Sequence, residues 1–259
     1  MPIRETTAAG EPVWTDLSSS DIEKTKAFYT GLFGWTYDEA APEAYGGYVS
    51  ARLNGQLVAG LSPYHPEGGG APNVWGLYLK SDGIEATAEA VGAAGGQVLV
   101  PPMHVDPFGH MAIFTDAAGA AVGAWQPQTH GGFGVDAEHG APAWFELHTK
   151  DFRTAVPFYE RAFGWKTAVM GDTDEFRYST LGEGDDARAG IMDASSYLPA
   201  EVPSFWITYW GADDVDATAA KAVELGGKVV TEPEDTPYGR MATLEDSTGA
   251  TFKLIGVTG

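Results

Sequence analysis

The sequence repeats itself after about 130 residues, and this repeat constrains the fold more than any other feature. Residues 26–35 read KAFYTGLFGW and residues 156–165 read VPFYERAFGW, so that five of the ten positions are identical. Further blocks match in the same order: 73–98 with 204–229, and 114–120 with 244–250. Three matched blocks in one order indicate a tandem duplication.

Each copy of the repeat is long enough for a domain of ordinary size. The residues between the copies are rich in Gly, His and Pro and show no hydrophobic period, as is typical of a linker. We therefore expect one domain at residues 1–127, a linker at 128–140 and a second domain at 141–259.

The hydrophobic pattern of each half predicts strands and helices in a fixed order. The S-x-x-E sequence that starts at Ser20 predicts the first turn of a helix, which should end at Gly34. A strand precedes this helix and strands follow it, with a hairpin predicted at Asn54-Gly55. The same order begins again at residue 74. We therefore predict an α+β fold with two βαβββ modules in each half and four in the chain, forming curved mixed sheets with helices on their outer face.

Charge and composition exclude several classes of protein. Asp and Glu number 36 against 15 Lys and Arg, which gives a net charge of −21 and leaves no basic surface for nucleic-acid phosphates or anionic lipid. The chain has no Cys, so disulfides, thiolate nucleophiles and zinc–thiolate sites are excluded. No apolar run has the length of a signal-peptide core or a membrane span. We expect a cytoplasmic protein without nucleic-acid or membrane partners, as a monomer or a homodimer.

Two motifs recur in both halves, FY-x-x-x-FGW at the end of the first helix and DxxGA before the last strand. Together with the predicted modules, they resemble the vicinal oxygen chelate superfamily, which includes glyoxalase I, bleomycin-resistance proteins and extradiol dioxygenases. More narrowly, the chain looks like the tandem glyoxalase-like proteins of actinobacteria, over about residues 11–126 and 141–257. This resemblance is specific for the fold and much less specific for an activity.

The resemblance implies a divalent metal held by His and Glu at four positions in each half. In this sequence the four pairs of positions are Trp14 and Trp144, Gly60 and Gly190, Gly76 and Ile207, and Gly123 and Lys253. Indole, glycine and isoleucine supply no ligand atom, and an ammonium group repels a cation. We therefore expect no metal and no other cofactor, and we do not expect metal-dependent glyoxalase I or extradiol dioxygenase activity.

The same resemblance implies which side chains face the concave side of each sheet. These candidate ligand-binding residues are Trp14, Asp16, Tyr78 and Trp125 in the first half, and Trp144, Tyr209 and Lys253 in the second. The aromatic side chains either form a pocket for a flat ligand or fill the space that a ligand would occupy. His110 and Arg240 occupy matched PxGx loops and are further candidates for binding a ligand, with a surface role as the alternative.

Glu146 and His148 are the candidate catalytic residues. They lie two positions apart on a predicted strand, so their side chains share a face and the carboxylate could support the imidazole as a general base. The alternative is a hydrogen-bonded polar pair at the edge of a cavity. Because Asp16 and Ser18 stand at the matched positions of the first half, any acid–base chemistry is expected in the second half.

Three functions remain open at this point. The leading hypothesis is a protein that binds a small, partly aromatic or apolar organic molecule in a concave pocket without the usual metal. The first alternative is an enzyme of secondary metabolism, a lyase, isomerase or hydroxylase that uses Glu146 and His148. The second alternative is a non-catalytic scaffold for protein interactions.

Overall fold

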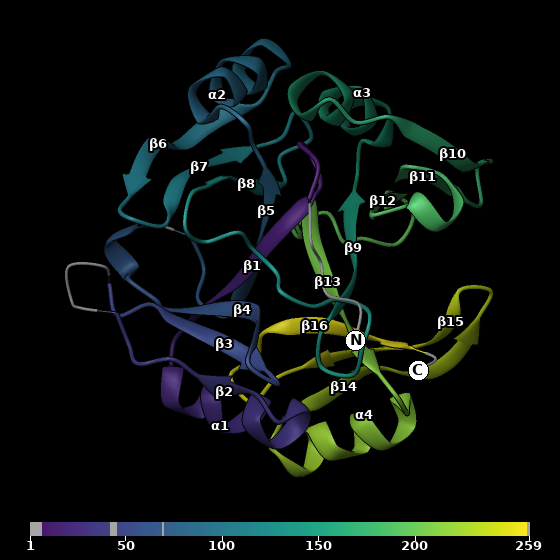
Figure 1. Ribbon diagram of the computed structural model, residues 1–259. Coiled ribbons are helices and arrows are strands. Elements are labelled where there is room, and N and C mark those ends of the chain that lie inside the picture. The colour runs from purple at the N-terminus through teal and green to yellow at the C-terminus, as the bar shows by residue number, and fades with distance from the viewer. Residues whose placement is uncertain (1–6, 42–45, 69, 258–259) are drawn as a thin grey trace.

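The structure consists of four copies of one unit, a strand followed by a helix and three further strands (Figure 1). This computed structural model describes residues 7–41, 46–68 and 70–257. The first half contains β1 (Pro12–Ser19), α1 (Ile22–Phe33), β2 (Thr36–Tyr37), β3 (Val49–Leu53), β4 (Gln56–Pro63), the short helix η2 (Pro66–Gly68), β5 (Val74–Lys80), α2 (Ile84–Ala93), β6 (Gln97–Val105), β7 (Gly109–Thr115) and β8 (Ala121–Pro127). The second half contains β9 (Pro142–Thr149), α3 (Phe152–Phe163), β10 (Thr167–Asp172), β11 (Arg177–Leu181), η3 (Gly184–Asp186), β12 (Ala189–Asp193), β13 (Phe205–Ala212), α4 (Val215–Glu224), β14 (Lys228–Thr236), β15 (Gly239–Glu245) and β16 (Thr251–Gly256). The predicted α+β class and βαβββ modules are confirmed.

Each half forms one mixed sheet of eight strands. The orders are β2-β3-β4-β1-β5-β8-β7-β6 and β10-β11-β12-β9-β13-β16-β15-β14. The first strand of each module pairs in parallel with its last strand, as β1 does with β4 and β9 with β12. The two modules of a half meet where their first strands pair antiparallel, β1 with β5 and β9 with β13. The face of these central strands that carries Asp16 on β1 and Glu146 on β9, here called the inner face, therefore has side chains from both modules of its half.

Helix α1 is defined by the residues at its two ends. Asp21 precedes it, and its carboxylate accepts a hydrogen bond from a backbone N–H of the first turn at 3.0 Å. The prediction that Ser20 begins the helix as its cap is therefore wrong by one residue, because Asp21 makes this bond. Gly34 ends the helix at a φ of 72°, a left-handed conformation that glycine adopts without steric cost. Asp151 and Gly164 have the same roles in α3.

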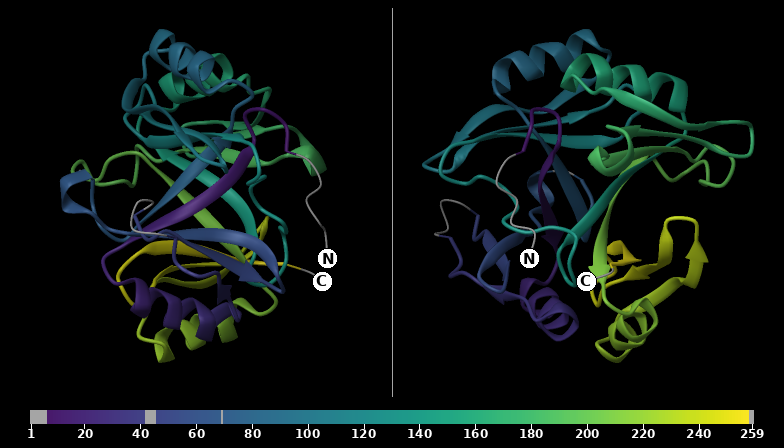
Figure 2. Two further views of the ribbon diagram at one scale, coloured as in Figure 1. Left: turned by 60° about the vertical axis from the view of Figure 1, so that its left-hand side comes forward. Right: turned by 45° about the vertical axis from the view of Figure 1, so that its right-hand side comes forward.

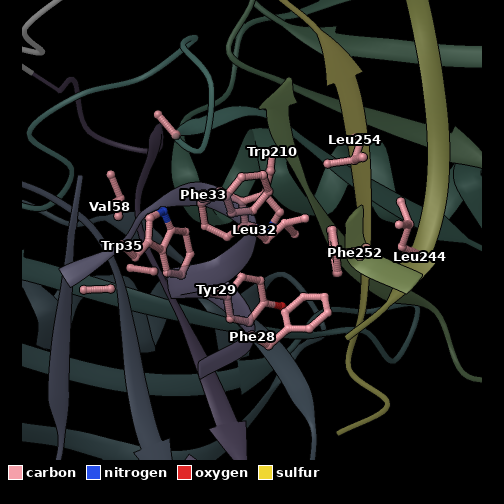
Figure 3. Packing of buried hydrophobic residues seen from close by; sticks show 14 of the residues in the cluster. Phe28, Tyr29, Leu32, Phe33, Trp35, Val58, Trp210, Leu244, Phe252 and Leu254 are labelled. Carbon is pink, nitrogen blue, oxygen red and sulfur yellow. The ribbon is translucent and has the colours of Figure 1, made fainter. Parts of the chain in front are cut away.

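The hydrophobic cores combine elements of both halves. In one core, Phe28 and Tyr29 of α1 lie against Phe252 of β16, with ring centroids 6.3 and 5.9 Å apart, and Trp35 contacts Trp210 of β13 at 5.0 Å (Figure 3). The other core joins α2 and α3 in the same way. Figures 1 and 2 show α1 beside α4 and α2 beside α3, at opposite ends of the molecule. Burial of apolar surface therefore holds the two halves to each other.

The segment between the two sheets is packed against the protein. Strand β8 ends at Pro127 and β9 begins at Pro142, so that this segment contains the residues expected to form a linker. Phe133 is 5% exposed and Val135 is fully buried, and each belongs to one of the two cores. The segment thus adds apolar contacts to the connection that it makes.

Two tryptophans of the repeated FGW motif form reciprocal hydrogen bonds between the halves. The indole N–H of Trp35 donates to the carbonyl oxygen of Gly140 at 2.8 Å, and that of Trp165 donates to the carbonyl oxygen of Gly10 at 2.8 Å. Both bonds are buried. Each half therefore binds the backbone just before the first strand of the other half.

The helices of the described residues are short. The longest, α1 and α3, have 12 residues each. None of the helices in residues 7–41, 46–68 and 70–257 combines the length and hydropathy that a membrane span requires.

Candidate functional site

The first half has a cavity on the inner face of its sheet. Its volume is about 770 Å³, and sites for small molecules typically measure about 300 to 1,000 Å³. Five aromatic side chains contribute to the lining: Trp14 of β1, Tyr48 before β3, Tyr78 of β5, Phe108 before β7 and Trp125 of β8. The imidazole of His130 lies edge-on to Trp14, with ring centroids 4.5 Å apart. Walls of this composition favour a flat, partly apolar ligand.

Asp16 is a carboxyl group in the lining of this cavity. Alternation along β1 directs Leu17 into a core and Asp16 to the inner face. The hydroxyl of Tyr48 donates to Asp16 Oδ2 at 3.4 Å, and the Trp14 indole N–H donates to the Tyr48 hydroxyl at 2.7 Å. Burial raises the pKa of Asp16 to about 7, because hydrogen bonds from Tyr78 and Tyr48 offset the loss of water only in part. At neutral pH this carboxyl therefore gains or loses its proton readily.

Glu146 stands at the matching position of the second half, and its carboxylate is hydrogen-bonded on both oxygens. Oε2 accepts from the hydroxyl of Tyr178 at 2.8 Å, and Oε1 accepts from the hydroxyl of Tyr209 at 2.6 Å. His148 Nε2 lies 2.8 Å from Oε1, so the structure brings the two candidate catalytic residues together. The Trp144 indole N–H donates to the Tyr178 hydroxyl at 3.0 Å, which repeats the Trp–Tyr–carboxyl chain of the first half.

Lys253 introduces a positive charge into this second cluster. Its Nζ donates to the hydroxyl of Tyr209 at 2.7 Å and lies 3.6 Å from Glu146 Oε1 and 3.4 Å from His148 Nε2. The ammonium also lies over the Tyr209 ring, 4.7 Å from its centroid. The hydroxyl of Tyr197 is 2.9 Å from His148 Nδ1. The second half thus contains a network of one carboxylate, one imidazole, one ammonium group and three phenols, joined by hydrogen bonds and ion pairs.

The charges of this network set the protonation of Glu146. Burial alone would raise its pKa, but the hydrogen bond from His148 and the positive charge of Lys253 outweigh burial and lower the pKa to about 2. Burial and the neighbouring carboxylate raise the pKa values of Tyr178 and Tyr209, so both phenols stay protonated and donate. Glu146 is therefore an ionised carboxylate whose oxygens are already occupied by donors.

His110 and Arg240 do not reach either cluster. Arg240 donates to Asp216 of α4 at 2.7 Å, and it shares its face of β15 with Ala242, which is buried in a core. His110 pairs across β7 and β8 with Gln126, whose side chain accepts the first backbone N–H of α2. Alternation along these strands directs both side chains toward the helices. Binding of a ligand by either residue stays a prediction: the His110 ring stacks on that of His104, a residue of the cavity lining, with ring centroids 4.5 Å apart.

Several residues of the two clusters were not predicted from the sequence. Tyr48 and Tyr178 lie 130 residues apart, at matched positions of the two halves, so the repeat itself contained a signal for them. Tyr197 and His130 lie in connecting segments without a matching tyrosine or histidine in the other half. No local pattern distinguishes these two residues from ordinary loop residues.

The family described as the Glyoxalase/Bleomycin resistance protein/Dioxygenase superfamily matches residues 12–123 and again residues 141–254. The chain belongs to this superfamily. Among curated relatives, it is 40% identical over 258 residues to "Putative glyoxylase CFP32" of Mycobacterium tuberculosis, with 98% of each chain covered. It is 37% identical over 263 residues to "Anthracycline biosynthesis protein DnrV" of Streptomyces peucetius, with 96% of this chain and 94% of that protein covered.

Two solved structures show the same fold at low sequence identity. The Mn(II)-bound glyoxalase from Novosphingobium aromaticivorans superimposes with a TM-score of 0.66 at 16% identity and covers 97% of this chain and 83% of that one. The 2,3-dioxygenase LapB from Pseudomonas sp. KL28 gives 0.68 at 11% identity, over 98% and 94% of the two chains. At these identities the likeness concerns the fold alone.

The residues at the superfamily's metal-ligand positions do not fit a metal in this chain. A Cβ atom at Gly60 would lie 1.7 Å from the Tyr48 hydroxyl oxygen, and one at Gly190 would lie 1.8 Å from that of Tyr178. The tyrosines therefore occupy the space that a ligand side chain would need. Lys253 places an ammonium group at a further position. Within the described part of the chain, no group of three or more His, Asp or Glu side chains is arranged to hold a metal ion.

Proposed function

We propose that this protein binds a flat, partly aromatic organic molecule in the cavity of its first half, and that it does so without a metal. The observation that carries the proposal is the aromatic lining of a cavity of about 770 Å³. Trp14 and Trp125 contribute indole rings to the cavity wall, and Asp16 and Tyr78 supply polar groups that could orient a ligand.

The relatives support a ligand of this kind. DnrV, of which this chain covers 94%, is named as a protein of anthracycline biosynthesis. Anthracyclines contain fused, flat rings, and the volume and aromatic lining of the first-half cavity suit such a molecule. We therefore take fused-ring quinones as the ligand class to test first.

Acid–base chemistry at Glu146 and His148 has less support than binding in the first half. The general base in that hypothesis is His148 with Glu146 as its supporting carboxylate, and both oxygens of Glu146 already accept hydrogen bonds, from Tyr178 and Tyr209. His148 is also hydrogen-bonded within the cluster, through Glu146 on one nitrogen and Tyr197 on the other. A substrate would have to displace these partners before it could exchange a proton.

The proposal is tested by titrating the protein with a hydroxymethyl-anthraquinone while the tryptophan fluorescence is recorded. Trp14→Phe should weaken binding by roughly tenfold, because it removes aromatic surface from the cavity and the hydrogen bond to Tyr48. Trp144→Phe is the matched control, since Trp144 makes the same bond to Tyr178 in the second half. Its affinity should equal that of the unaltered protein.

Thermal unfolding of both variants establishes that they are folded before their affinities are compared. The titration is repeated with a chelator present, which should leave the affinity unchanged. No binding by the unaltered protein, or equal losses in the two variants, would refute binding in the first half. A loss of binding on chelation would refute the metal-free part.

A further inference from the structure

The cavity of the first half is lined by acidic groups. Four carboxyl side chains contribute to it: Asp16, Asp38, Glu39 and Asp106. Among the described residues of the lining there is no Lys or Arg. The nearby cation Arg52 is held by Asp38 through two hydrogen bonds of 2.7 and 2.9 Å. A cavity with this charge disfavours an anionic ligand and favours a neutral or cationic one.

The second half shows what partner this scaffold provides for its inner carboxyl group. There the Lys253 ammonium lies 3.6 Å from Glu146 Oε1 and donates to the Tyr209 hydroxyl. In the first half the corresponding strand position is Gly123, which pairs with Tyr78 as Lys253 pairs with Tyr209. The first half thus keeps the carboxyl group and the tyrosines but has no built-in ammonium at this position.

We propose that the ligand itself supplies this ammonium: the first-half cavity selects flat aromatic molecules that carry a protonated amine, and the amine pairs with Asp16. The aromatic side chains that line the same cavity add cation–π attraction for such a group. This inference rests on the proposed function, because it presupposes that the cavity binds a flat aromatic molecule.

The surroundings of Asp16 link binding of the amine to loss of the carboxyl proton. From the neighbouring strands it faces Gly60 and Gly76, and the phenols that reach it belong to Tyr48 and Tyr78. The other titratable groups of the lining are His104, His130, Asp38, Glu39 and Asp106. Because burial raises the pKa of Asp16 to about 7, the carboxyl is largely protonated in mildly acidic solution. A bound ammonium favours the ionised form, so binding releases a proton there and strengthens as the pH rises through about 7.

The test compares two ligands that differ only in one group, an aminomethyl-anthraquinone and the corresponding hydroxymethyl-anthraquinone. Isothermal calorimetry at about pH 8 should give at least roughly tenfold tighter binding of the amine to the unaltered protein. In Asp16→Asn the ratio of the two affinities should fall to about one. Asp82→Asn is the control for removal of one negative charge, since Asp82 is 71% exposed and pairs with Lys80. It should keep the ratio of the unaltered protein.

A second measurement checks the coupled proton. At about pH 6, the heat of amine binding should depend on the ionisation enthalpy of the buffer, which reports proton release, and this dependence should vanish in Asp16→Asn. Equal affinities of amine and alcohol for the unaltered protein would overturn the inference and leave the proposed function standing. An amine preference that survives in a folded Asp16→Asn would overturn it too. Failure of both ligands to bind would instead refute the proposed function.

Discussion

The two halves of this protein build their inner faces on the same strands and reach different results. In both, a tryptophan donates to a tyrosine hydroxyl, and the tyrosine donates to a carboxyl group on the first strand. Two of the matched positions at which the halves differ matter most here: Ser18 and Gly123 stand where the second half has His148 and Lys253. In the second half the imidazole and the ammonium join a network around Glu146, and in the first half Asp16 lines a cavity. The second half therefore has a built-in cation beside its inner carboxylate, and the first half has glycine at the matching position.

The difference is visible in the protonation of the two carboxyl groups. Burial raises the pKa of Asp16 to about 7, with no charged partner to oppose it. Burial acts in the same direction on Glu146, but His148 and Lys253 reverse its effect and lower the pKa to about 2. The two matched carboxyl groups thus differ in pKa, which is about 7 for Asp16 and about 2 for Glu146.

The largest effect is expected from breaking the second network. Lys253→Met leaves the buried carboxylate of Glu146 without its cation, and we expect the free energy of unfolding to fall by about 3 to 5 kcal/mol. Lys228→Met is the control, because its ammonium also lies 3.6 Å from a carboxylate, that of Glu245, but is 70% exposed. The control should lose less than about 1 kcal/mol in urea unfolding. Equal losses would show that burial of the network does not increase the contribution of its ion pair to stability.

The next effect concerns Asp16. Its pKa is higher in the folded protein than in the unfolded chain, so the folded state binds the proton more tightly. The free energy of unfolding should therefore fall as the pH rises through about 7. Asp16→Asn lacks this group and should not show the fall. The difference in free energy of unfolding between the variant and the unaltered protein should therefore shift by about 3 kcal/mol in favour of the variant between about pH 5 and pH 8. Parallel pH curves in urea unfolding would contradict the assignment.

Glu146 should show the opposite dependence on pH. Its pKa is lower in the folded protein, so its contribution is present above the unfolded value and is lost as the pH falls toward about 2. Between about pH 4.5 and pH 3 we expect a loss of about 2 kcal/mol that Glu146→Gln does not show. Carbon-13 NMR of the Glu146 carboxyl offers a check that needs no variant. A carboxyl that is already protonated at about pH 4 would refute the prediction.

The smallest expected effect is the loss of stability on removal of a helix cap, and it should be equal in the two halves. Asp21 and Asp151 cap α1 and α3 through the same bond, at 3.0 and 3.1 Å. Replacement of either by Ala should lower the free energy of unfolding by about 1 kcal/mol. Thermal or urea unfolding of the two variants measures the difference. A clear inequality would mean that the halves have diverged in their scaffold as well as in their inner faces.

The sequence contains most of the information about the fold. The helix start near Ser20, its end at Gly34 and the Asn54-Gly55 hairpin depend on contacts within a few residues, and the repeat extends the same prediction to the second half. The pairing of α1 with α4 and of α2 with α3 was not predicted. An apolar helix face indicates that it is buried, but it does not indicate which half of the chain covers it.

The candidate sites were predictable only in part, because the sequence shows which residues share a face of one strand but not which strands lie side by side. Strand alternation places Glu146 and His148 on one face, and the structure brings them together. The same alternation places His110 on the face of β7 that carries Ala112, and Arg240 on the face of β15 that carries Ala242. Both alanines are buried in the cores, so this face lies toward the helices. The ring that fills the space above Gly60 comes from Tyr48 on the other side of a hairpin. Its role depends on the register between strands, which the residue type alone does not give.

The reciprocal indole bonds have a consequence for how this molecule diverged. Trp35 and Trp165 each hold the opposite half by a backbone carbonyl, and a carbonyl is present whatever residue supplies it. Substitutions at Ser18 or Gly123 leave those attachments untouched, so natural selection could remodel one interior while its twin stayed as it was. Because both halves belong to one polypeptide, a substitution in one half leaves the other unchanged, whereas in a pair of identical subunits every substitution appears twice.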